Sequence, residues 1–150
     1  MTNRAVEFIS ALSVDRGLVE RLELLPFSIT GTRRICLHQS ETSPLHGMLV
    51  ESAPGSTFPA HYHADGDEVT VSVCGRLEIM VWERGPNEKP TRLVLGSGAD
   101  DAKIAFIRRN VPHSTKALDD NCVYFEVKLG PFKKEALVQV SATDLVGGNG

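Results

Sequence analysis

The stretch between Gly55 and Gly75, GSTFPAHYHADGDEVTVSVCG, constrains the fold more than any other part of the chain. His61 and His63 are separated by one residue, so on a β-strand both imidazoles point to the same face. The polar, glycine-containing turn after them lets the chain reverse and bring Glu68 back toward the two rings. Two neutral imidazoles and a carboxylate suit Mn, Fe, Co, Ni or Zn better than Ca or Mg. The stretch therefore predicts two strands that carry three ligands of a metal site.

A further histidine, His113 in the segment NVPHST, lies far along the chain after another apolar run. From a different strand it would complete a site of three imidazoles and one carboxylate; otherwise water would fill its position. The alternative for the whole set is a surface hairpin with solvated polar side chains, or a barrel without a metal.

The chain from Arg33 onward consists of short apolar runs separated by glycine, proline and asparagine. In one run Val69, Val71 and Val73 alternate with Thr70 and Ser72, the pattern of a strand with two different faces. Many short strands at regular spacing predict an all-β, antiparallel barrel. The strands that we expect are Arg33–His38, His46–Ala53, the residues next to His61, Val69–Val73, Arg76–Glu83, Arg92–Leu95, Ala102–Ile107, Ser114–Ala117 and Asn121–Leu129.

The segment before this β-rich region has one helical pattern. Its apolar residues at helical spacing are Leu18, Val19, Leu22 and Leu25. Asp15 stands where a side chain can cap the first turn, and Pro26 ends the pattern. We therefore expect a short helix that lies on the body of the domain.

The length of 150 residues predicts one domain, with an extension at 1–32, a barrel at about 33–135 and a tail at 136–150, mobile from 147 to 150. The net charge of −3 disfavours nucleic acid and anionic membranes as partners, so we expect a small-molecule ligand. Three cysteines without a CxxC pair indicate a reducing compartment. The N-terminus has no long apolar run, which favours the cytoplasm.

The spacing of the first motif carries a resemblance to a known superfamily. Gly55, five residues, His61-x-His63, four residues, Glu68, six residues and Gly75 resemble the first conserved motif of the cupin superfamily at every fixed position. The resemblance implies a double-stranded β-helix, the jelly-roll barrel. It also implies one divalent transition metal, Mn, Fe, Ni or Zn, and a homodimer.

The second cupin motif is matched only at His113 among its chemical residues. Arg108 stands at its proline position, Asn110 at its glycine position and Ala117 at its closing asparagine. Asparagine tolerates positive φ better than other non-glycine residues, so Asn110 can still form the turn.

Within the superfamily, four pieces of the chain are similar to the small bacterial cupin metalloproteins of the WbuC family. They are residues 33–40, the spaced motif, 75–85 and 123–132, and together they span about 33–135. Members of that family are often encoded in surface-polysaccharide gene clusters, which favours a sugar-like or sugar-nucleotide substrate.

Two further residues are candidates for catalysis. Glu126 shares a strand face with Tyr124 and Lys128, opposite an apolar face that packs inward by default; if the barrel is polar inside, Glu126 is a general acid/base or orients a ligand imidazole. The alternative is an exposed ion pair with Lys128. His38 shares a face with Cys36, and if that face lines the barrel, His38 contacts the substrate or relays a proton.

Positively charged residues gather near predicted strand ends. They are Arg33, Arg34, Arg108, Arg109 and Lys116. They either bind an anionic substrate, such as a carboxylate or a sugar nucleotide, or form a solvated surface.

Two functions are consistent with these features. The first is a metal-dependent enzyme, an isomerase, lyase or dioxygenase, that acts on a small polar substrate at an open metal position. The second is a non-catalytic metal-binding, ligand-binding or sensor cupin. Phosphate-binding glycine loops and activated nucleophile motifs are missing from the sequence.

Overall fold

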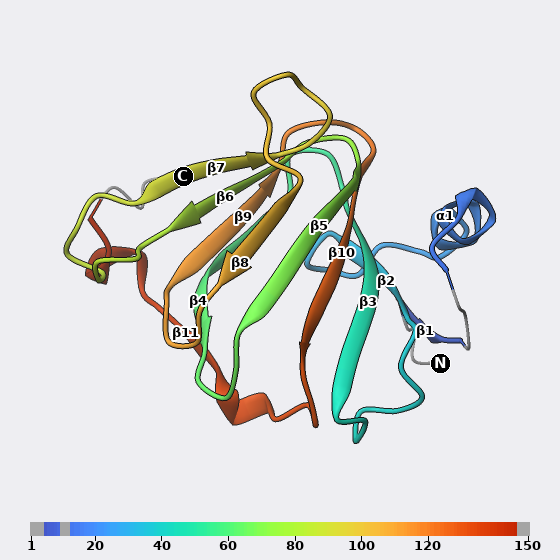
Figure 1. Cartoon of the computed structure of the whole chain (residues 1–150), viewed down its shortest axis with the longest axis horizontal. Coiled ribbons are helices and arrows are strands. Elements are labelled where there is room, and N and C mark those ends of the chain that lie inside the picture. The colour runs from blue at the N-terminus through green and yellow to red at the C-terminus, as the bar shows by residue number, and fades with distance from the viewer. Residues whose placement is uncertain (1–4, 10–12, 147–150) are drawn as a thin grey trace.

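The computed structural model describes residues 5–9 and 13–146, which form two facing β-sheets with a helix on the outside (Figure 1). The six-stranded sheet has the order β1 (Val6–Phe8), β2 (Thr32–Cys36), β3 (Leu45–Ser52), β10 (Cys122–Leu129), β5 (Glu68–Cys74) and β8 (Ile104–Ile107). The five-stranded sheet has the order β11 (Leu137–Gln139), β4 (Thr57–His63), β9 (His113–Ala117), β6 (Leu77–Val81) and β7 (Thr91–Leu95). The predicted all-β jelly-roll barrel is confirmed.

The connections explain how distant segments meet. Strands β4 and β5 follow each other in the chain but belong to different sheets, so the turn at residues 64–67 crosses the barrel. Strand β10 lies between β3 and β5, and β9 lies between β4 and β6. The three histidines of the expected site are therefore on β4 and β9, which are neighbouring strands of one sheet. Glu68 is at the start of β5 in the other sheet.

The barrel interior is apolar over much of its length. The buried residues of this inner cluster are Cys36, Met48, Val50, Leu77, Ile79, Val81, Leu95, Ala105, Ile107, Ala117, Cys122 and Tyr124. Ile79 and Leu95 are completely buried. They come from strands in which every second residue points inward, as the alternation in the sequence predicts.

Helix α1 (Arg16–Glu23) forms a second apolar layer outside the six-stranded sheet. Leu18 and Leu22 pack on Ile35, Leu49 and Val123. The Asp15 carboxylate accepts a hydrogen bond of 2.9 Å from the backbone N–H of Leu18, which satisfies one of the free donors at the helix start. The predicted helix and its cap are confirmed.

The two ends of the chain contribute more to the barrel than the sequence predicts. Strand β1 adds a parallel edge to β2, and β11 pairs with β4 within the segment expected to be a tail. Two 3₁₀ turns, η1 (Lys134–Ala136) and η2 (Ala142–Asp144), flank β11. The Trp82 indole N–H donates to the Val146 carbonyl, so this segment packs against the barrel. The mobile tail expected at 147–150 lies outside the described residues.

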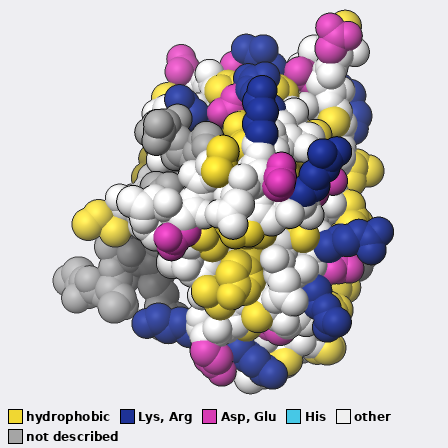
Figure 2. Space-filling view, turned by 90° about the vertical axis from the view of Figure 1, so that its left-hand side faces the viewer, with side chains coloured by type: hydrophobic (Ala, Val, Ile, Leu, Met, Phe, Trp, Pro, Cys, Tyr) yellow, Lys and Arg dark blue, Asp and Glu magenta, His cyan; other side chains and the backbone are white. Residues whose placement is uncertain are grey.

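Neither a membrane-crossing helix among the described residues nor a large basic face on the side drawn in Figure 2 is present. Within residues 5–9 and 13–146, no helix has the length and apolar character that crossing a membrane requires. Figure 2 shows lysine, arginine and carboxylate side chains interspersed on one side of the molecule, where they are not gathered by sign.

Candidate metal site

Three histidines from two adjacent strands meet inside the barrel. His61 on β4 lies opposite His113 on β9 in the antiparallel register, and alternation puts His63 on the same face as His61. One ring nitrogen of each histidine lies within 4.8 Å of those of the other two. All three side chains are buried, with exposed fractions of 1–8%. The residue types and their clustering are those of a site that can hold a metal ion.

Backbone carbonyls fix the orientation of two of the rings. Nδ1 of His61 lies 3.0 Å from the Pro59 carbonyl, and Nδ1 of His113 lies 3.0 Å from the Val111 carbonyl. Because a carbonyl only accepts, Nδ1 carries the proton in both rings and Nε2 keeps a free lone pair. A register shift in β4 between Phe58 and His61 permits this contact, and Pro59, which has no N–H, suits such an irregularity.

Glu68 faces the histidines from the other sheet. One of its carboxylate oxygens lies 2.9 Å from Nε2 of His63, and the other lies 3.8 Å from Nε2 of His113. Burial favours the neutral acid, but contact with His63 and the charge of His113 outweigh it, so the pKa of Glu68 is lowered. The crossing turn therefore brings an ionised carboxylate to the imidazoles.

The surroundings of His61 and His113 favour the neutral imidazole. Burial and the neighbouring His113 lower the pKa of His61 to about 4, and burial lowers the pKa of His113. Nε2 of His113 is buried, and no hydrogen bond satisfies it among the described residues. Such a buried, unsatisfied lone pair is costly unless a ligand binds it. A divalent transition metal therefore fits this donor set.

The turns on both sides of the site use left-handed backbone conformations. Gly55 and Gly75 have φ of 69° and 67°, and Asn110 has φ of 63°. The expectation that Asn110 forms the turn in place of glycine is confirmed. Its N–H donates to the His63 carbonyl at 2.8 Å, so this turn ties β4 to the segment that leads into His113.

A cavity of about 60 Å³ adjoins the imidazoles, which is room for several water-sized groups. The other residues that line it are Thr32, Arg34, Val50, Phe58, Glu68, Thr115, Tyr124, Glu126, Lys128 and Leu137. The six-stranded sheet supplies its charged wall opposite the histidines. The cavity is thus large enough for a small molecule and has polar groups on two sides.

Glu126 belongs to this wall, which corrects the default expectation for β10. Tyr124, Glu126 and Lys128 face the cavity, whereas Val123 and Phe125 pack with the helix layer outside. The apolar face still packs, but against α1. Glu126 and Lys128 line the cavity instead of lying on the outer face of the sheet. Burial and the negative charge of Glu68 raise the pKa of Glu126.

His38 is not among the residues that line the cavity. Strand β2 ends at Cys36, but the backbone N–H of Leu37 still donates to the Gly47 carbonyl, which puts His38 opposite His46. The His38 ring stacks on His46 with centroids 3.9 Å apart, and its Nδ1 lies 3.1 Å from the Gly47 carbonyl. Because a carbonyl only accepts, Nδ1 is the donor. His38 is therefore a hydrogen-bonded histidine next to His46 and is not in the wall of the cavity.

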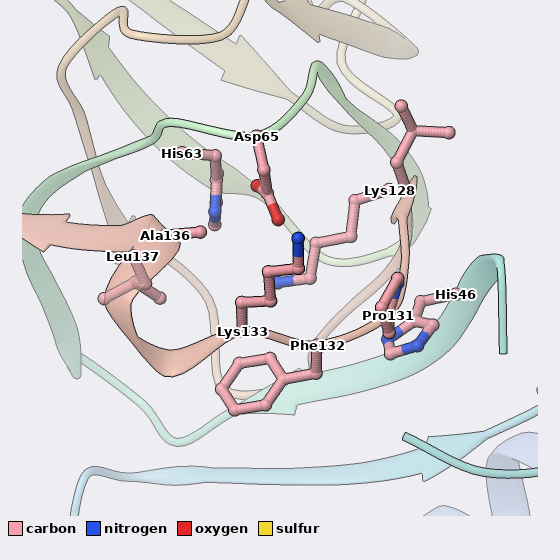
Figure 3. Close-up of a pocket in the computed structure, with 10 residues that line it drawn as sticks. His46, His63, Asp65, Lys128, Pro131, Phe132, Lys133, Ala136 and Leu137 are labelled. Atoms are coloured by element: carbon pink, nitrogen blue, oxygen red, sulfur yellow. The ribbon is translucent and has the colours of Figure 1, made fainter. Parts of the chain in front are cut away.

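A second, smaller pocket of about 20 Å³ adjoins the cavity and shares His63, Lys128 and Leu137 with it. Figure 3 shows Lys128 and Lys133 reaching into this pocket from two sides, with Asp65 pointing toward them and His46 at its edge. No motif or spacing in the sequence connects Lys133 or Asp65 with the site. Lys128 lies at the boundary between the two spaces.

The arrangement of strands and the buried histidine cluster define a cupin fold, and comparisons with solved structures support this class. KdgF from Halomonas sp. matches with a TM-score of 0.53 and 16% identity, covering 70% of this chain and 84% of that one. Oxalate decarboxylase from Bacillus subtilis matches with a TM-score of 0.57 and 16% identity, covering 73% of this chain and 27% of that one. One structure of that decarboxylase concerns its Mn(II) centres.

Comparison with models of protein families matches only part of the chain. Residues 32–93 match the family model of a domain of unknown function, DUF6016. The matched segment contains the first motif and ends before His113. No curated protein matches the chain.

Proposed function

We propose that this cupin binds one divalent transition metal through His61, His63, His113 and Glu68. The observation that carries the proposal is the set of buried imidazoles, two of which are held by backbone carbonyls with Nε2 left free. Glu68 adds a negative charge at 2.9 Å from His63. The Mn(II) centres of the structurally similar oxalate decarboxylase support a metal of this kind.

We further propose that the protein is an enzyme that acts on a small polar molecule in the adjoining cavity. When bound, a divalent ion polarises a carbonyl or hydroxyl oxygen of a substrate. Glu126 supplies a group that can give or take a proton, because its raised pKa brings its titration closer to neutral pH. The similarity to the WbuC family favours a sugar-like substrate. An open metal position beside a proton-transfer group is suited to an isomerase, lyase or dioxygenase reaction.

The alternative is a metal-binding or ligand-binding cupin without catalysis, such as a sensor. A storage or sensor protein does not need a proton-transfer group beside its metal position. The presence of Glu126 in the cavity wall, on the side opposite the histidines, favours the enzyme. Cytoplasmic localisation and a homodimer stay predictions.

The first experiment is the metal content of protein produced without an affinity tag. We expect close to one equivalent of Mn, Fe, Ni or Zn in the wild type and a large loss in His61→Ala, His63→Ala and His113→Ala. The matched control is His38→Ala, which removes an imidazole outside the cavity and should keep the metal. A wild type that contains no metal and cannot be loaded would refute the proposal.

The metal that is found selects the activity assays. Iron directs the search to oxygen-dependent reactions, and Mn, Ni or Zn to isomerisation and elimination of sugars and sugar acids. In either case Glu126→Gln should retain the metal and lose turnover. An active enzyme whose Glu126→Gln variant turns over normally would show that another group moves the proton.

A further inference from the structure

The cavity wall opposite the histidines contains a guanidinium group that has no partner among the described residues. Arg34 on β2 is half-buried and lines the cavity. Among the hydrogen bonds and ion pairs of residues 5–9 and 13–146, none involves its side chain. A half-buried guanidinium with five donors and no acceptor is unusual, because these groups are ordinarily paired.

The neighbouring Arg33 shows the ordinary case on the same strand. Its guanidinium lies 2.7 Å from the Glu51 carboxylate, and it also donates to the Leu25 carbonyl at 2.8 Å. Successive residues of a strand point to opposite faces, so Arg33 is on the outer side and Arg34 on the inner side of the sheet. The two arginines that the sequence presents as equivalent therefore differ in both place and pairing.

Lys128 provides a second cation on this wall. It lies opposite Glu68 in the register of β10 and β5, yet the two side chains form no ion pair, because the Glu68 carboxylate contacts His63 instead. Lys128 lines both the cavity and the smaller pocket, into which it reaches in Figure 3. Its ammonium group is therefore also available to a ligand.

The charges in the cavity leave an excess of positive charge when a metal is bound. The carboxyl groups that line it are those of Glu68 and Glu126, and the cations are Arg34 and Lys128. When both carboxyl groups are ionised, their two negative charges cancel the two positive charges. The charge of a divalent ion at the imidazoles then has no counter-charge in the cavity. A neutral ligand would leave this charge buried, whereas an anionic ligand would offset it.

We propose that Arg34, assisted by Lys128, binds the carboxylate of a small organic acid. The other oxygen atoms of the acid reach the metal position at the three imidazoles. A guanidinium binds a carboxylate through two parallel hydrogen bonds. The planar guanidinium fork matches the planar carboxylate in shape. This inference rests on the proposed metal site and narrows its substrate class from small polar molecules to carboxylic acids.

The test measures ligand binding to the full chain loaded with Co²⁺, whose visible absorption responds to a ligand at the metal. The probes are glycolate, oxalate and malonate, each beside its neutral amide, and inorganic phosphate. We expect the acids to bind more tightly than the amides. Arg34→Gln should weaken acid binding about 10- to 100-fold, as expected for the loss of a charge-assisted pair.

Two variants separate the role of Arg34 from a general loss of charge. Arg34→Lys keeps the cation and should restore part of the affinity. Arg92→Gln removes a charge from the exposed ion pair with Glu78 outside the cavity and should bind acids as the wild type does. Equal binding of acids and amides, wild-type binding by Arg34→Gln, a preference for phosphate, or no binding of any of the three acids would overturn the inference.

A second measurement distinguishes this inference from the proposed metal site. In metal-free protein, the same acids should raise the melting temperature of the wild type more than that of Arg34→Gln. If Co²⁺ does not bind but this difference is observed, the metal proposal fails and the arginine site stands. If Co²⁺ binds and no Arg34-dependent effect is seen in either assay, the metal site stands and the inference fails.

Discussion

The metal-free protein should lose stability in mild acid because of His61. Burial and the neighbouring His113 lower the pKa of His61 from 6.5 to about 4 in the folded chain. The unfolded chain therefore takes up this proton first, and stability falls as the pH drops from about 6.5 to about 4. Since one pKa unit corresponds to about 1.4 kcal/mol, lowering the pH from about 7.5 to about 5 should cost about 2 kcal/mol at this residue.

The substitution that isolates this contribution is His61→Asn. The asparagine amide can still donate to the Pro59 carbonyl, which accepts from Nδ1 of His61 at 3.0 Å, but it does not titrate. Urea unfolding of chelator-treated protein at both pH values gives the free energy of unfolding. We expect the wild type to lose about 2 kcal/mol more than the variant.

Comparison with the variant removes the contributions of the other groups that titrate in this range. His38→Asn serves as the control, because His38 lies outside the histidine cluster, and it should behave as the wild type does. An equal loss of stability in the wild type and His61→Asn would refute the reasoning, since the buried imidazole would then not be held in its neutral form.

Three other predictions follow from the fold and the site. Gly55→Ala should cost about 1–2 kcal/mol of unfolding free energy, since its φ of 69° is left-handed but no atom lies within 4 Å of the new Cβ. Gly75→Ala should cost clearly more, because its Cβ would lie 2.1 Å from the Asn121 carbonyl oxygen. Similar melting temperatures for the two variants would contradict this. Leu22→Ala should cost about 2–5 kcal/mol of unfolding free energy, because Leu22 is fully buried under the helix, whereas exposed Leu24→Ala should be nearly neutral. Light scattering should give twice the chain mass of 16.3 kDa if the expected homodimer forms, and a mass of one chain would exclude it.

The sequence predicts most of the barrel because its strands alternate clearly. Strand β6 is an example, since Leu77, Ile79 and Val81 alternate with other residues and are buried. Strand β5 alternates as clearly, but there Glu68 and Thr70 are buried and Val73 is exposed. Strands β1 and β11 have three residues each, which is too short for a period of two to be recognised. Their positions depend on pairing with distant strands, which is not encoded locally.

The candidate site was predictable where spacing alone determines it. His61, His63 and Glu68 follow from alternation and a turn, and the left-handed Asn110 supports the register of the segment before His113. The orientation of Glu126 was not predictable from its strand, because both faces of β10 are packed, one against the cavity and one against α1. Only the presence of the helix decides which face is inside.

Arg34 could have been found from the sequence by extending the same alternation. It is in phase with Thr32 and Cys36, which are buried toward the interior, and out of phase with Ile35, which packs under the helix. The cluster of basic residues concealed this difference, since Arg33 and Arg34 are adjacent and chemically identical.

The helix layer outside β2, β3 and β10 has a consequence for how such a protein can change. Val123 and Phe125 hold β10 against the outer layer, and Cys122 and Tyr124 pack in the inner cluster. Glu126 and Lys128 of the same strand line the cavity and belong to neither cluster. A duplicated gene can therefore exchange these two side chains and acquire a different substrate while the packing of the strand is retained.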